Sequence, residues 1–486
     1  MEGVFAQEVS DFLHAHAGFF TGLSWSILIL GLIQNIVYAL QLPAAFIELR
    51  RHSQAEDTES AWQLLLSDVA IPISLLVPAY NEEQTIVENV RSILSLKYPD
   101  FEVLVVNDGS KDKTLDVLIE AFSLRPITRA HKLWVRHQPV KGVYGSSVYP
   151  NLFVIDKVNG KGKADASNAA LTFARHPLFC VVDADSLLEG EALLRSLRPF
   201  MEDAKMIAVG GTIRVLNGCV VKSGQVEDVR LPRNFYPLIQ SLEYIRAFLM
   251  SRLAWSHWGM LSIISGAFGI FNRGLSVDVG GFSADTVGED YELVIKLHRK
   301  MMEDKRPYSM RYVPEPVCWT EAPDSFKMLG NQRKRWQRGA LEVFFKHKDM
   351  LFRPRYGKMG MFALPHNFIV DVLGPLAEAV GYILIPIFWM TGVLNTDFIL
   401  AFMAMFFLFG VFISVSSLVL EEMELRRVPH ARDLAILAGV AVIENFGYRQ
   451  MNNIWRIIGW WQYLRKNNQW GEMTRTGFSH AKDKKD

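Results

Sequence analysis

The stretch from Phe19 to Phe46 contains no charged residue, and this constrains the fold of the chain more than any other feature. An α-helix rises about 1.5 Å per residue, so roughly 20 apolar residues cross the hydrocarbon core of a bilayer. The stretch exceeds that length, and it lacks the basic leader of a cleaved signal peptide. We therefore expect residues 1–48 to hold an N-terminal segment and a transmembrane helix.

A second apolar region lies toward the end of the chain, at residues 364–464. Within it, residues 364–391 and 398–420 predict two spans. Residues 434–464 fit either one long crossing or a re-entrant or interfacial hairpin, because charged residues interrupt their apolar pattern. The long crossing would leave the C-terminus outside, and the hairpin would keep it inside.

Flanking charges predict the orientation of the first span. Glu2, Glu8 and Asp11 precede it, whereas Arg50 and Arg51 follow it. Because basic residues favour the cytoplasmic side, the N-terminus should lie outside and the middle of the chain in the cytoplasm. These charges predict an integral protein of the inner or plasma membrane with a cytoplasmic catalytic domain.

Several polar residues fall within the predicted C-terminal spans and the ambiguous segment. They are Asp371, Glu378, Glu444, Asn445 and Arg449. Such groups are costly in lipid, so we expect them either to line a hydrated path or to make contacts between helices.

The charge balance and the cysteines exclude several classes of protein. With 52 Lys+Arg against 51 Asp+Glu, the chain has no overall field that would attract nucleic acid. Cys180, Cys219 and Cys318 are too widely spaced for a disulfide framework or a structural zinc site. We interpret them as buried thiols in a reducing compartment.

The middle of the chain repeats a pattern of apolar strand, polar turn and helix. Residues 71–78 predict a strand that is followed by Asn81 as the N-cap of a helix, and residues 101–106 predict a strand that ends at Asp108. This pattern predicts a parallel α/β sheet with a ligand edge where the strands end. Asp108 could instead be a simple turn residue in an Asp-Gly pair.

Two carboxylates follow the apolar run 178–182, in the segment Asp183-Ala184-Asp185. A strand that delivers paired carboxylates to its carboxyl end builds a site for a hard divalent cation and for the diphosphate that the cation bridges. This indicates group transfer from a nucleotide. Lys161 and Lys163 lie in a glycine-containing loop that would suit the diphosphate, although such a loop is often merely solvated and is not a Walker A sequence.

Two segments have the pattern of amphipathic interface helices. Residues 238–258 repeat apolar positions at helical spacing, and residues 343–351 lie just ahead of the second apolar region. Each could lie in the membrane interface or pack on the soluble core. We assign residues 346–363 to an interface segment and residues 465–486 to a tail.

Five motifs occur in the order and approximate spacing of a known family: Pro78-Ala79-Tyr80-Asn81-Glu82, Asn107-Asp108-Gly109-Ser110, Asp183-Ala184-Asp185, Gly288-Glu289-Asp290 and Gln332-Arg333-Lys334-Arg335-Trp336. In these motifs the chain resembles the inverting, processive membrane glycosyltransferases of family 2, which include cellulose, hyaluronan, chitin and poly-N-acetylglucosamine synthases. The resemblance covers about residues 70–350 and the flanking spans. It implies a GT-A (Rossmann-like) α/β domain at residues 70–345, inserted between N-terminal and C-terminal transmembrane helices.

The resemblance also implies roles for individual residues. Nucleotide and donor binding would use Ala79, Tyr80, Glu82, Asp108, Lys161, Lys163 and Asp183, and Mg²⁺ or Mn²⁺ would bind Asp183 and Asp185. The acceptor site would use Gly266, Glu289, Gln332 and Trp336. Asp290 would be the general base, and Arg335 would neutralise the leaving diphosphate.

These roles agree with the chemistry, because inversion at an anomeric carbon is one in-line displacement that needs a single carboxylate as base. The simpler interpretations stay open. Glu289 and Asp290 could only favour a helix N-terminus, Trp336 could be an interface anchor, and residues 265–273 could be a plain strand and turn rather than the floor of the acceptor site.

The chain also departs from this family. It lacks the gating loop expected after Trp336 and a C-terminal cyclic-di-GMP domain, while Trp470 to Arg475 distantly resembles the gate of hyaluronan synthases.

The resemblance predicts a processive inverting enzyme that polymerises a β-linked polysaccharide from a UDP-sugar of the glucose or N-acetylglucosamine type and translocates it. A transferase that adds one sugar to a lipid carrier and a non-catalytic receptor or assembly subunit are the alternatives. The expected partners are the UDP-sugar donor, the growing glycan acceptor, membrane lipid, and export or regulatory subunits.

Overall fold

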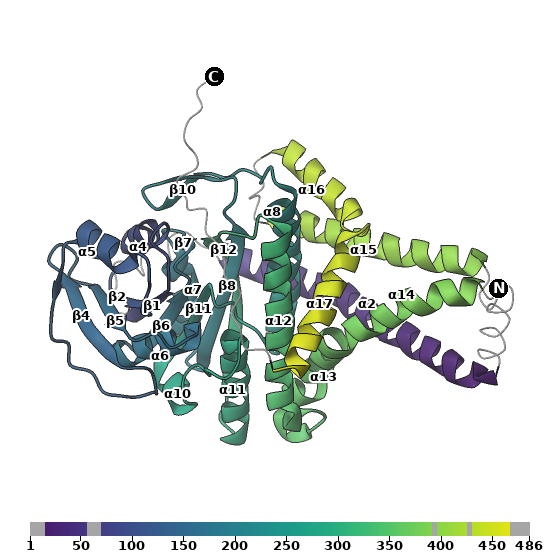
Figure 1. Ribbon diagram of the computed structural model, residues 1–486, viewed down its shortest axis with the longest axis horizontal. Coiled ribbons are helices and arrows are strands. Elements are labelled where there is room, and N and C mark those ends of the chain that lie inside the picture. The colour runs from purple at the N-terminus through teal and green to yellow at the C-terminus, as the bar shows by residue number, and fades with distance from the viewer. Residues whose placement is uncertain (1–14, 56–69, 391–395, 425–429, 467–486) are drawn as a thin grey trace.

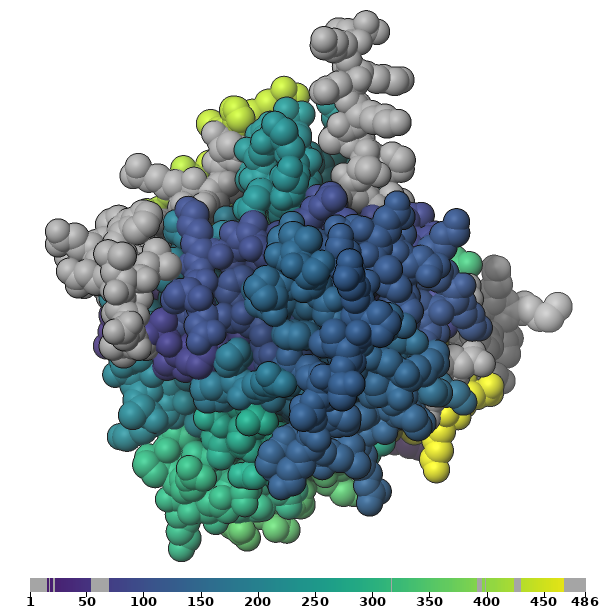
Figure 2. All heavy atoms as spheres, turned by 90° about the vertical axis from the view of Figure 1, so that its left-hand side faces the viewer, coloured from purple at the N-terminus to yellow at the C-terminus, as the bar shows by residue number. Residues whose placement is uncertain are grey.

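The computed structural model describes residues 15–55, 70–390, 396–424 and 430–466. Figure 1 shows an α/β domain at one end of the molecule and long helices that project from it toward the other end. Figure 2 views the molecule from the left-hand side of Figure 1, where most of the surface is formed by the first α/β units of the domain.

The sheet domain is built on a mixed sheet. In the described residues the sheet has ten strands in the order β3-β4-β5-β2-β1-β6-β11-β8-β12-β7, and β9 and β10 form a separate hairpin. The strands are β1 (Ile73–Ala79), β2 (Phe101–Asn107), β3 (Leu124–Pro126), β4 (Val140–Ser146), β5 (Leu152–Lys157), β6 (Leu178–Val182), β7 (Ser186–Leu188), β8 (Met206–Val215), β9 (Val220–Lys222), β10 (Gln225–Asp228), β11 (Phe268–Asn272) and β12 (Ser309–Thr320).

The prediction of a parallel sheet holds for only part of it. Strands β5, β2, β1 and β6 are parallel neighbours, whereas β11 runs antiparallel to both β6 and β8, and β3, β4 and β7 pair antiparallel at the two sides. The repeated strand and helix pattern predicts the parallel part because each crossover helix returns the chain to the same end of the sheet. The prediction of a parallel sheet was therefore wrong for the antiparallel pairs outside this central group.

The helices cover the sheet and connect it to the projecting bundle. The α-helices are α2 (Ala17–Ala55), α4 (Ile86–Leu94), α5 (Thr114–Phe122), α6 (Lys163–Phe173), α7 (Ala192–Glu202), α8 (Phe235–Tyr244), α9 (Leu253–His257), α10 (Arg273–Asp278), α11 (Glu289–Glu303), α12 (Phe326–Lys346), α13 (Leu364–Asn367), α14 (Gly374–Met390), α15 (Thr396–Glu424), α16 (Ala431–Ile443) and α17 (Tyr448–Leu464). The π- and 3₁₀-helical segments are η1 (Ile245–Arg252), η2 (Lys348–Met350), η3 (Pro354–Tyr356), η4 (Met359–Ala363) and η5 (Phe368–Leu373).

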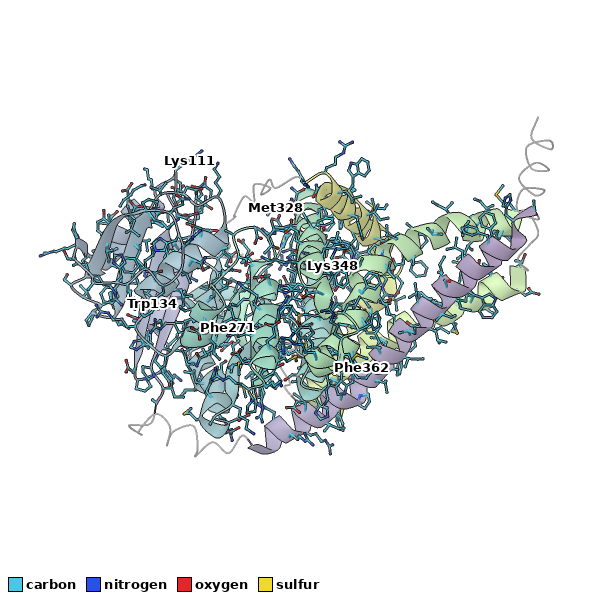
Figure 3. All side chains as sticks on the ribbon, turned by 90° about the horizontal axis from the view of Figure 1, so that it is seen from below. Lys111, Trp134, Phe271, Met328, Lys348 and Phe362 are labelled. Atoms are coloured by element: carbon cyan, nitrogen blue, oxygen red, sulfur yellow. The ribbon has the colours of Figure 1, made fainter. Side chains whose placement is uncertain are left out.

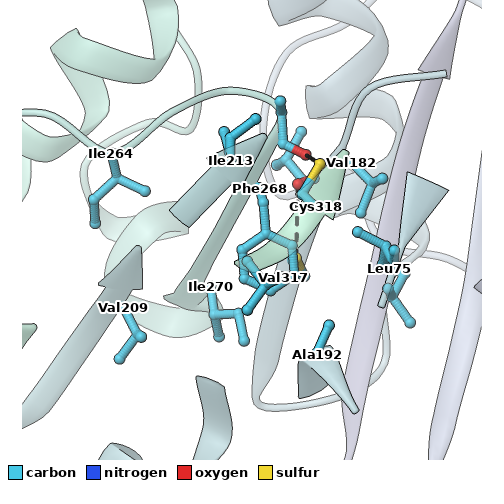
Figure 4. Close-up of a cluster of buried hydrophobic side chains, with 14 of the residues drawn as sticks. Leu75, Val182, Ala192, Val209, Ile213, Ile264, Phe268, Ile270, Val317 and Cys318 are labelled. Atoms are coloured by element: carbon cyan, nitrogen blue, oxygen red, sulfur yellow. Dashed lines mark hydrogen bonds between the residues drawn. The ribbon is translucent and has the colours of Figure 1, made fainter. Parts of the chain in front are cut away.

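The core of the domain explains why the central strands form. β1, β2 and β6 are buried along nearly all of their length, as expected for parallel strands with helices on both faces. Figure 4 shows the neighbouring part of this core, where Phe268 of β11 packs with Val317 of β12. Cys180 and Cys318 are buried free thiols in this core and Cys219 is half-buried, so no disulfide forms among the described residues.

The turn after β1 differs from its prediction. α4 begins at Ile86, with Thr85 in the N-cap position, so Asn81 is not the N-cap. Asn81 adopts a positive φ of 57°, and its Oδ1 accepts a hydrogen bond of 2.9 Å from the backbone N–H of Lys111. An asparagine tolerates this conformation better than most residues, and here it joins the turns that follow β1 and β2.

Three helices of the described chain are long and apolar enough to cross a membrane: Gly18–Ser53, Met359–Met390 and Ile399–Met423. All three overlap the predicted spans, although the second begins at Met359, within the predicted interface segment, because η4, α13, η5 and α14 follow one another without a break. Figure 3 shows the long helices extending away from the sheet domain, where Trp134 lies at the far end.

Residues 434–464 lie in two helices joined by a turn, α16 and α17, rather than in one continuous helix. α16 has 13 residues, about 20 Å at 1.5 Å per residue, which is shorter than a bilayer core. The turn to α17 contains Gly447 at a φ of 86°. α16 packs on α15 and α8, whereas α17 packs along α12 and α14.

The segments predicted as interface helices are packed against protein. Ile239, Leu242 and Leu249 are almost completely buried, and α8 and η1 lie between β8 and the helices α2, α15 and α16. Val343 and Met350 are buried as well. The apolar pattern of both segments therefore reflects packing on the sheet domain and on the membrane helices.

Candidate active site

The residues of the predicted ligand edge lie at or directly after the carboxyl ends of β1, β2 and β6. Ala79 is buried at the end of β1, while the side chain of the next residue, Tyr80, is 44% exposed. The backbone N–H of Glu82 donates to Thr114 Oγ1 (2.9 Å), and its carboxylate accepts from Thr85 Oγ1 (2.8 Å). Tyr80 is therefore available to a ligand, whereas Glu82 supports the turn.

Asp108 is buried and has a partner that the motif does not contain. Lys157, at the end of β5, is fully buried and forms ion pairs with both Asp108 and Asp165. The backbone N–H of Gly160 also donates to Asp108 Oδ1 (3.0 Å). Burial raises the pKa of Asp108 above its ordinary value, although the hydrogen bonds from Lys157 and Gly160 oppose this.

The two lysines of the predicted diphosphate loop have different places. Lys161 is exposed, with a positive φ of 61°, at the tip of the loop. Lys163, at the start of α6, forms an ion pair with Asp183 and donates to the backbone oxygen of Gly266 (2.8 Å). The loop therefore contributes Lys163 to the centre of the site, while Lys161 faces solvent.

Glu289 and Asp290 are the first two residues of α11 and lie beside Lys163. Asp290 accepts two backbone hydrogen bonds of 2.8 Å, from Gly266 to Oδ2 and from Tyr291 to Oδ1. A Cβ atom on Gly266 would lie 2.8 Å from Lys163 Nζ and 3.2 Å from Asp290 Oδ2, so any larger residue there would displace the lysine. These contacts place the segment around Gly266 at the site rather than in a remote turn.

The electrostatics of this cluster are unusual. Burial, and then the charge of Asp290, raise the pKa of Glu289 to about 7, although Lys163 and Arg335 lower it. Burial lowers the pKa of Lys163, but Asp183, Glu289 and Asp290 raise it more, so the net pKa lies above its ordinary value. A small cavity is lined by Lys163, Ser167, Gly266, Glu289 and Asp290, among others. Perturbed carboxyl groups around a cavity are typical of functional sites.

The turn that contains Asp183 and Asp185 is stabilised by hydrogen bonds from a residue outside the motif. Asn89 on α4 donates to the backbone oxygens of Asp183 (2.9 Å) and Ser186 (2.5 Å). Asp183 is one-third exposed, whereas Asp185 is buried and accepts from Ser186 Oγ at 3.3 Å. A polar residue on the buried face of a short amphipathic helix is the sequence signal that could have identified Asn89.

Asp183 and Asp185 fit a divalent cation by the chemistry of their donor set. Two carboxylates of one turn, completed by phosphate oxygens and water, are the oxygen ligands that Mg²⁺ prefers. The described residues contain no group of three or more His, Cys, Asp or Glu side chains that could hold a metal. The protein side chains alone would therefore supply only part of a coordination shell.

Helix α12 brings the Gln-x-x-Arg-Trp segment to the same place. A Cβ atom on Gly288 would come within 3.3 Å of the backbone of Gly339, so α12 lies directly against the start of α11. Gln332 is buried, and within the described structure its Oε1 accepts no hydrogen bond. Arg335 is close enough to lower the pKa of Glu289, and Trp336 is 45% exposed.

The structure thus brings together Lys163, Asp183, Gly266, Glu289 and Asp290 at one point and places α12 beside them. Asp108 and Lys157 lie at the neighbouring strand ends, and Lys161 points away. The predicted tail motif from Trp470 to Arg475 lies outside the described residues.

Comparisons with known proteins identify the family of the α/β domain. The model of the family described as "Glycosyltransferase like family 2" matches residues 71–339. A poly-beta-1,6-N-acetyl-D-glucosamine synthase of Staphylococcus epidermidis is 28% identical over 300 residues, which cover 62% of this chain and 61% of that protein. The protein of the same name from Staphylococcus aureus (strain COL) is 26% identical over 301 residues, 62% of each chain. The chain thus spans about three-fifths of the length of these relatives.

Among solved structures, a mannosyltransferase from Pyrobaculum calidifontis, in complex with GDP-Man and Mn²⁺, aligns with a TM-score of 0.49 and 20% identity. The alignment covers 88% of this chain and 99% of that one.

Proposed function

Because the chain belongs to glycosyltransferase family 2, and is therefore a glycosyltransferase of the GT-A fold, we propose that it polymerises a β-linked polysaccharide of N-acetylglucosamine from the UDP-sugar. One observation supports this proposal most strongly. Lys163, Asp183 and the Glu289-Asp290 pair form one cluster, and α12, which contains the Gln-x-x-Arg-Trp segment, packs against the start of α11. The name of the staphylococcal relatives supports the choice of sugar.

In this mechanism Asp290 takes the proton of the acceptor hydroxyl. Its two backbone hydrogen bonds fix the carboxylate, which reduces the reorganisation needed during the reaction. Glu289, with a pKa near 7, binds the acceptor as a hydrogen-bond donor when protonated. Glu289 and Asp290 thus have separate roles because burial raises the pKa of Glu289.

The donor binds at the ends of β1, β2 and β6. Asp108 and Tyr80 face the nucleotide base, and Lys163 and Arg335 face the diphosphate, whose negative charge increases as the bond to the sugar breaks. Asp183 and Asp185 would hold Mg²⁺ or Mn²⁺, which supplies further positive charge to the leaving group. Since the described side chains supply only part of a coordination shell, the cation binds together with the donor.

The catalytic domain faces the cytoplasm, where nucleotide sugars are made, and the product leaves through the membrane helices. The basic residues after the first span support this orientation. A cysteine placed at Glu2 should react with an impermeant reagent outside intact cells, whereas a cysteine at the exposed position Lys113 should not. The reverse labelling would contradict the orientation.

The function is tested with protein purified in detergent and supplied with UDP-N-acetylglucosamine and Mg²⁺ or Mn²⁺. We expect release of UDP together with a polymer that a glycosidase specific for β-1,6-linked N-acetylglucosamine digests. UDP release with only one sugar added to a lipid would favour the lipid-carrier alternative. An absence of transfer from every UDP-sugar would contradict the proposal.

Metal dependence is tested separately by the binding of Mn²⁺, measured by electron paramagnetic resonance with and without UDP. We expect tight binding only when UDP is present, and its loss in Asp185→Asn. Equal binding without UDP would mean that the protein completes the metal site without the diphosphate.

A further inference from the structure

Arg333 lies within the Gln-x-x-Arg-Trp segment but has no role in the proposed chemistry. Its side chain is only 10% exposed, which is unusual for an arginine on a helix that borders an active site. Burying a guanidinium is costly unless it is paired and hydrogen-bonded. Its contacts therefore show what the buried charge is used for.

The first set of contacts holds the guanidinium in place. Arg333 Nη2 donates to Glu243 Oε2 on α8 at 2.5 Å. The hydroxyl of Tyr448, the first residue of α17, donates to the same oxygen at 3.0 Å. Three helices that are distant in sequence thus meet at one carboxylate, and α12 and α17 lie side by side in Figure 1.

The second contact is with the tryptophan of the motif. The guanidinium carbon of Arg333 lies 4.6 Å from the centroid of the Trp336 ring, within the range of a cation–π contact. Trp336 is nevertheless 45% exposed, so the arginine supports part of the ring while much of the indole stays open. An exposed aromatic ring on the helix that packs against the start of α11 is suited to stacking against a sugar.

We propose that Arg333 is a positioning residue that holds the Trp336 indole as a platform for the acceptor glycan, and that Glu243 and Tyr448 hold Arg333. This inference rests on the proposed function, because it assumes that an acceptor sugar stacks on Trp336. The planar guanidinium can pair with Glu243 and stack on the ring at once, whereas a lysine ammonium is a point charge that cannot do both equally well.

The experiment is a double-mutant cycle with Arg333→Lys, Trp336→Ala and the combined variant. Initial rates are measured with a β-1,6-linked N-acetylglucosamine oligosaccharide as acceptor and saturating UDP-N-acetylglucosamine. Arg333→Lys should raise the acceptor KM about tenfold, the size expected for a partly desolvated cation–π contact, with kcat and donor KM nearly unchanged. In the Trp336→Ala background, Arg333→Lys should have no further effect on acceptor KM.

Two further variants separate positioning from a general structural role. Tyr448→Phe removes one hydroxyl and should raise acceptor KM slightly, in the same direction. If Arg333→Lys lowers the thermal unfolding temperature, Glu243→Gln replaces it in the same cycle.

If Arg333→Lys raises the acceptor KM equally in the wild-type protein and in the Trp336→Ala variant, the positioning role is overturned, whereas the proposed function is not affected. A wild-type protein that elongates no acceptor would overturn both, and this outcome is visible before any variant is compared.

Discussion

The ligand edge of the sheet and its junction with the membrane helices both bury charged side chains, but the pairs differ. At the ligand edge the pairs are lysine with aspartate: Lys157 with Asp108, and Lys163 with Asp183. At the junction three pairs join arginine to glutamate: Arg214 with Glu421, Arg246 with Glu444, and Arg333 with Glu243.

The difference follows from what each region must do. Asp183 remains one-third exposed, so a substrate can exchange partners with it, and lysine is a mobile point charge that permits this. At the junction Glu421 and Glu444 are 1% exposed, and each arginine joins elements far apart in sequence. A planar guanidinium suits that fixed task. Under the proposed function the partly exposed Asp183 serves binding, whereas Arg214 and Arg246 at the junction hold helices and strands together.

The largest expected effect is at the ligand edge. Asp290→Asn should slow transfer by about a hundred- to ten-thousandfold, because it removes the base. The asparagine oxygen can still accept from the N–H of Gly266, so UDP binding measured by calorimetry should persist. If Asp290→Asn transfers sugar near the normal rate, Asp290 acts only as a helix cap. If the variant no longer binds UDP, Asp290 has a structural role.

At the junction we expect a loss of stability. Arg246→Met leaves Glu444 without its 2.6 Å partner and should cost about 3–5 kcal/mol, seen as a lower unfolding temperature in detergent. The double variant Arg246→Met/Glu444→Leu removes both charges and should recover most of the loss. A single variant as stable as the wild type would show that the remaining Arg449 suffices for Glu444.

A smaller effect is expected behind the Asp183 turn. Asn89→Ala removes the two hydrogen bonds to the turn and should weaken Mn²⁺ binding in the presence of UDP by about 10- to 100-fold, as for other supports of metal ligands. Ser95→Ala, at the C-cap of the same helix and away from the turn, is the matched control. Equal affinity in Asn89→Ala and the control would show that the turn keeps its shape unaided.

A further prediction concerns pH and stability. Because the pKa of Glu289 rises from 4.5 to about 7 on folding, the folded state binds more protons between these values, and stability should fall as pH rises through this window. Glu289→Gln should flatten the dependence of unfolding temperature on pH between about 4.5 and 7. If Glu289→Gln leaves the slope of unfolding temperature against pH unchanged, another titrating group causes the pH dependence.

The sequence predicts the ligand edge well because each strand end is a local feature. The turns at Asp108 and Asp183 follow directly from apolar runs, and the strands they end are neighbours through β1. The resemblance to family 2 then gave the right family, whereas the contact between Asp290 and Gly266 comes from the structure. The roles of these residues in catalysis stay predictions.

The supporting residues could not be predicted in this way. Lys157 and Asp108 are 49 positions apart, Asn89 and Asp183 are 94 apart, and Arg333 and Glu243 are 90 apart. Each pair exists only because β5 lies beside β2, or because helices pack across the domain, so no local pattern identifies the partner. The N-cap interpretation of Asn81 failed for the same reason, since its partner Lys111 follows a different strand.

The sequence by itself determined that apolar helices flank an α/β domain and that carboxylates end its strands, because span length and strand pattern are properties of short segments. Only the tertiary structure decided that the sheet is mixed, that residues 434–464 divide into two helices that pack on different partners, and that residues 238–258 are packed between the sheet and the membrane helices. An apolar face must be buried, but which surface buries it depends on the packing of the whole chain.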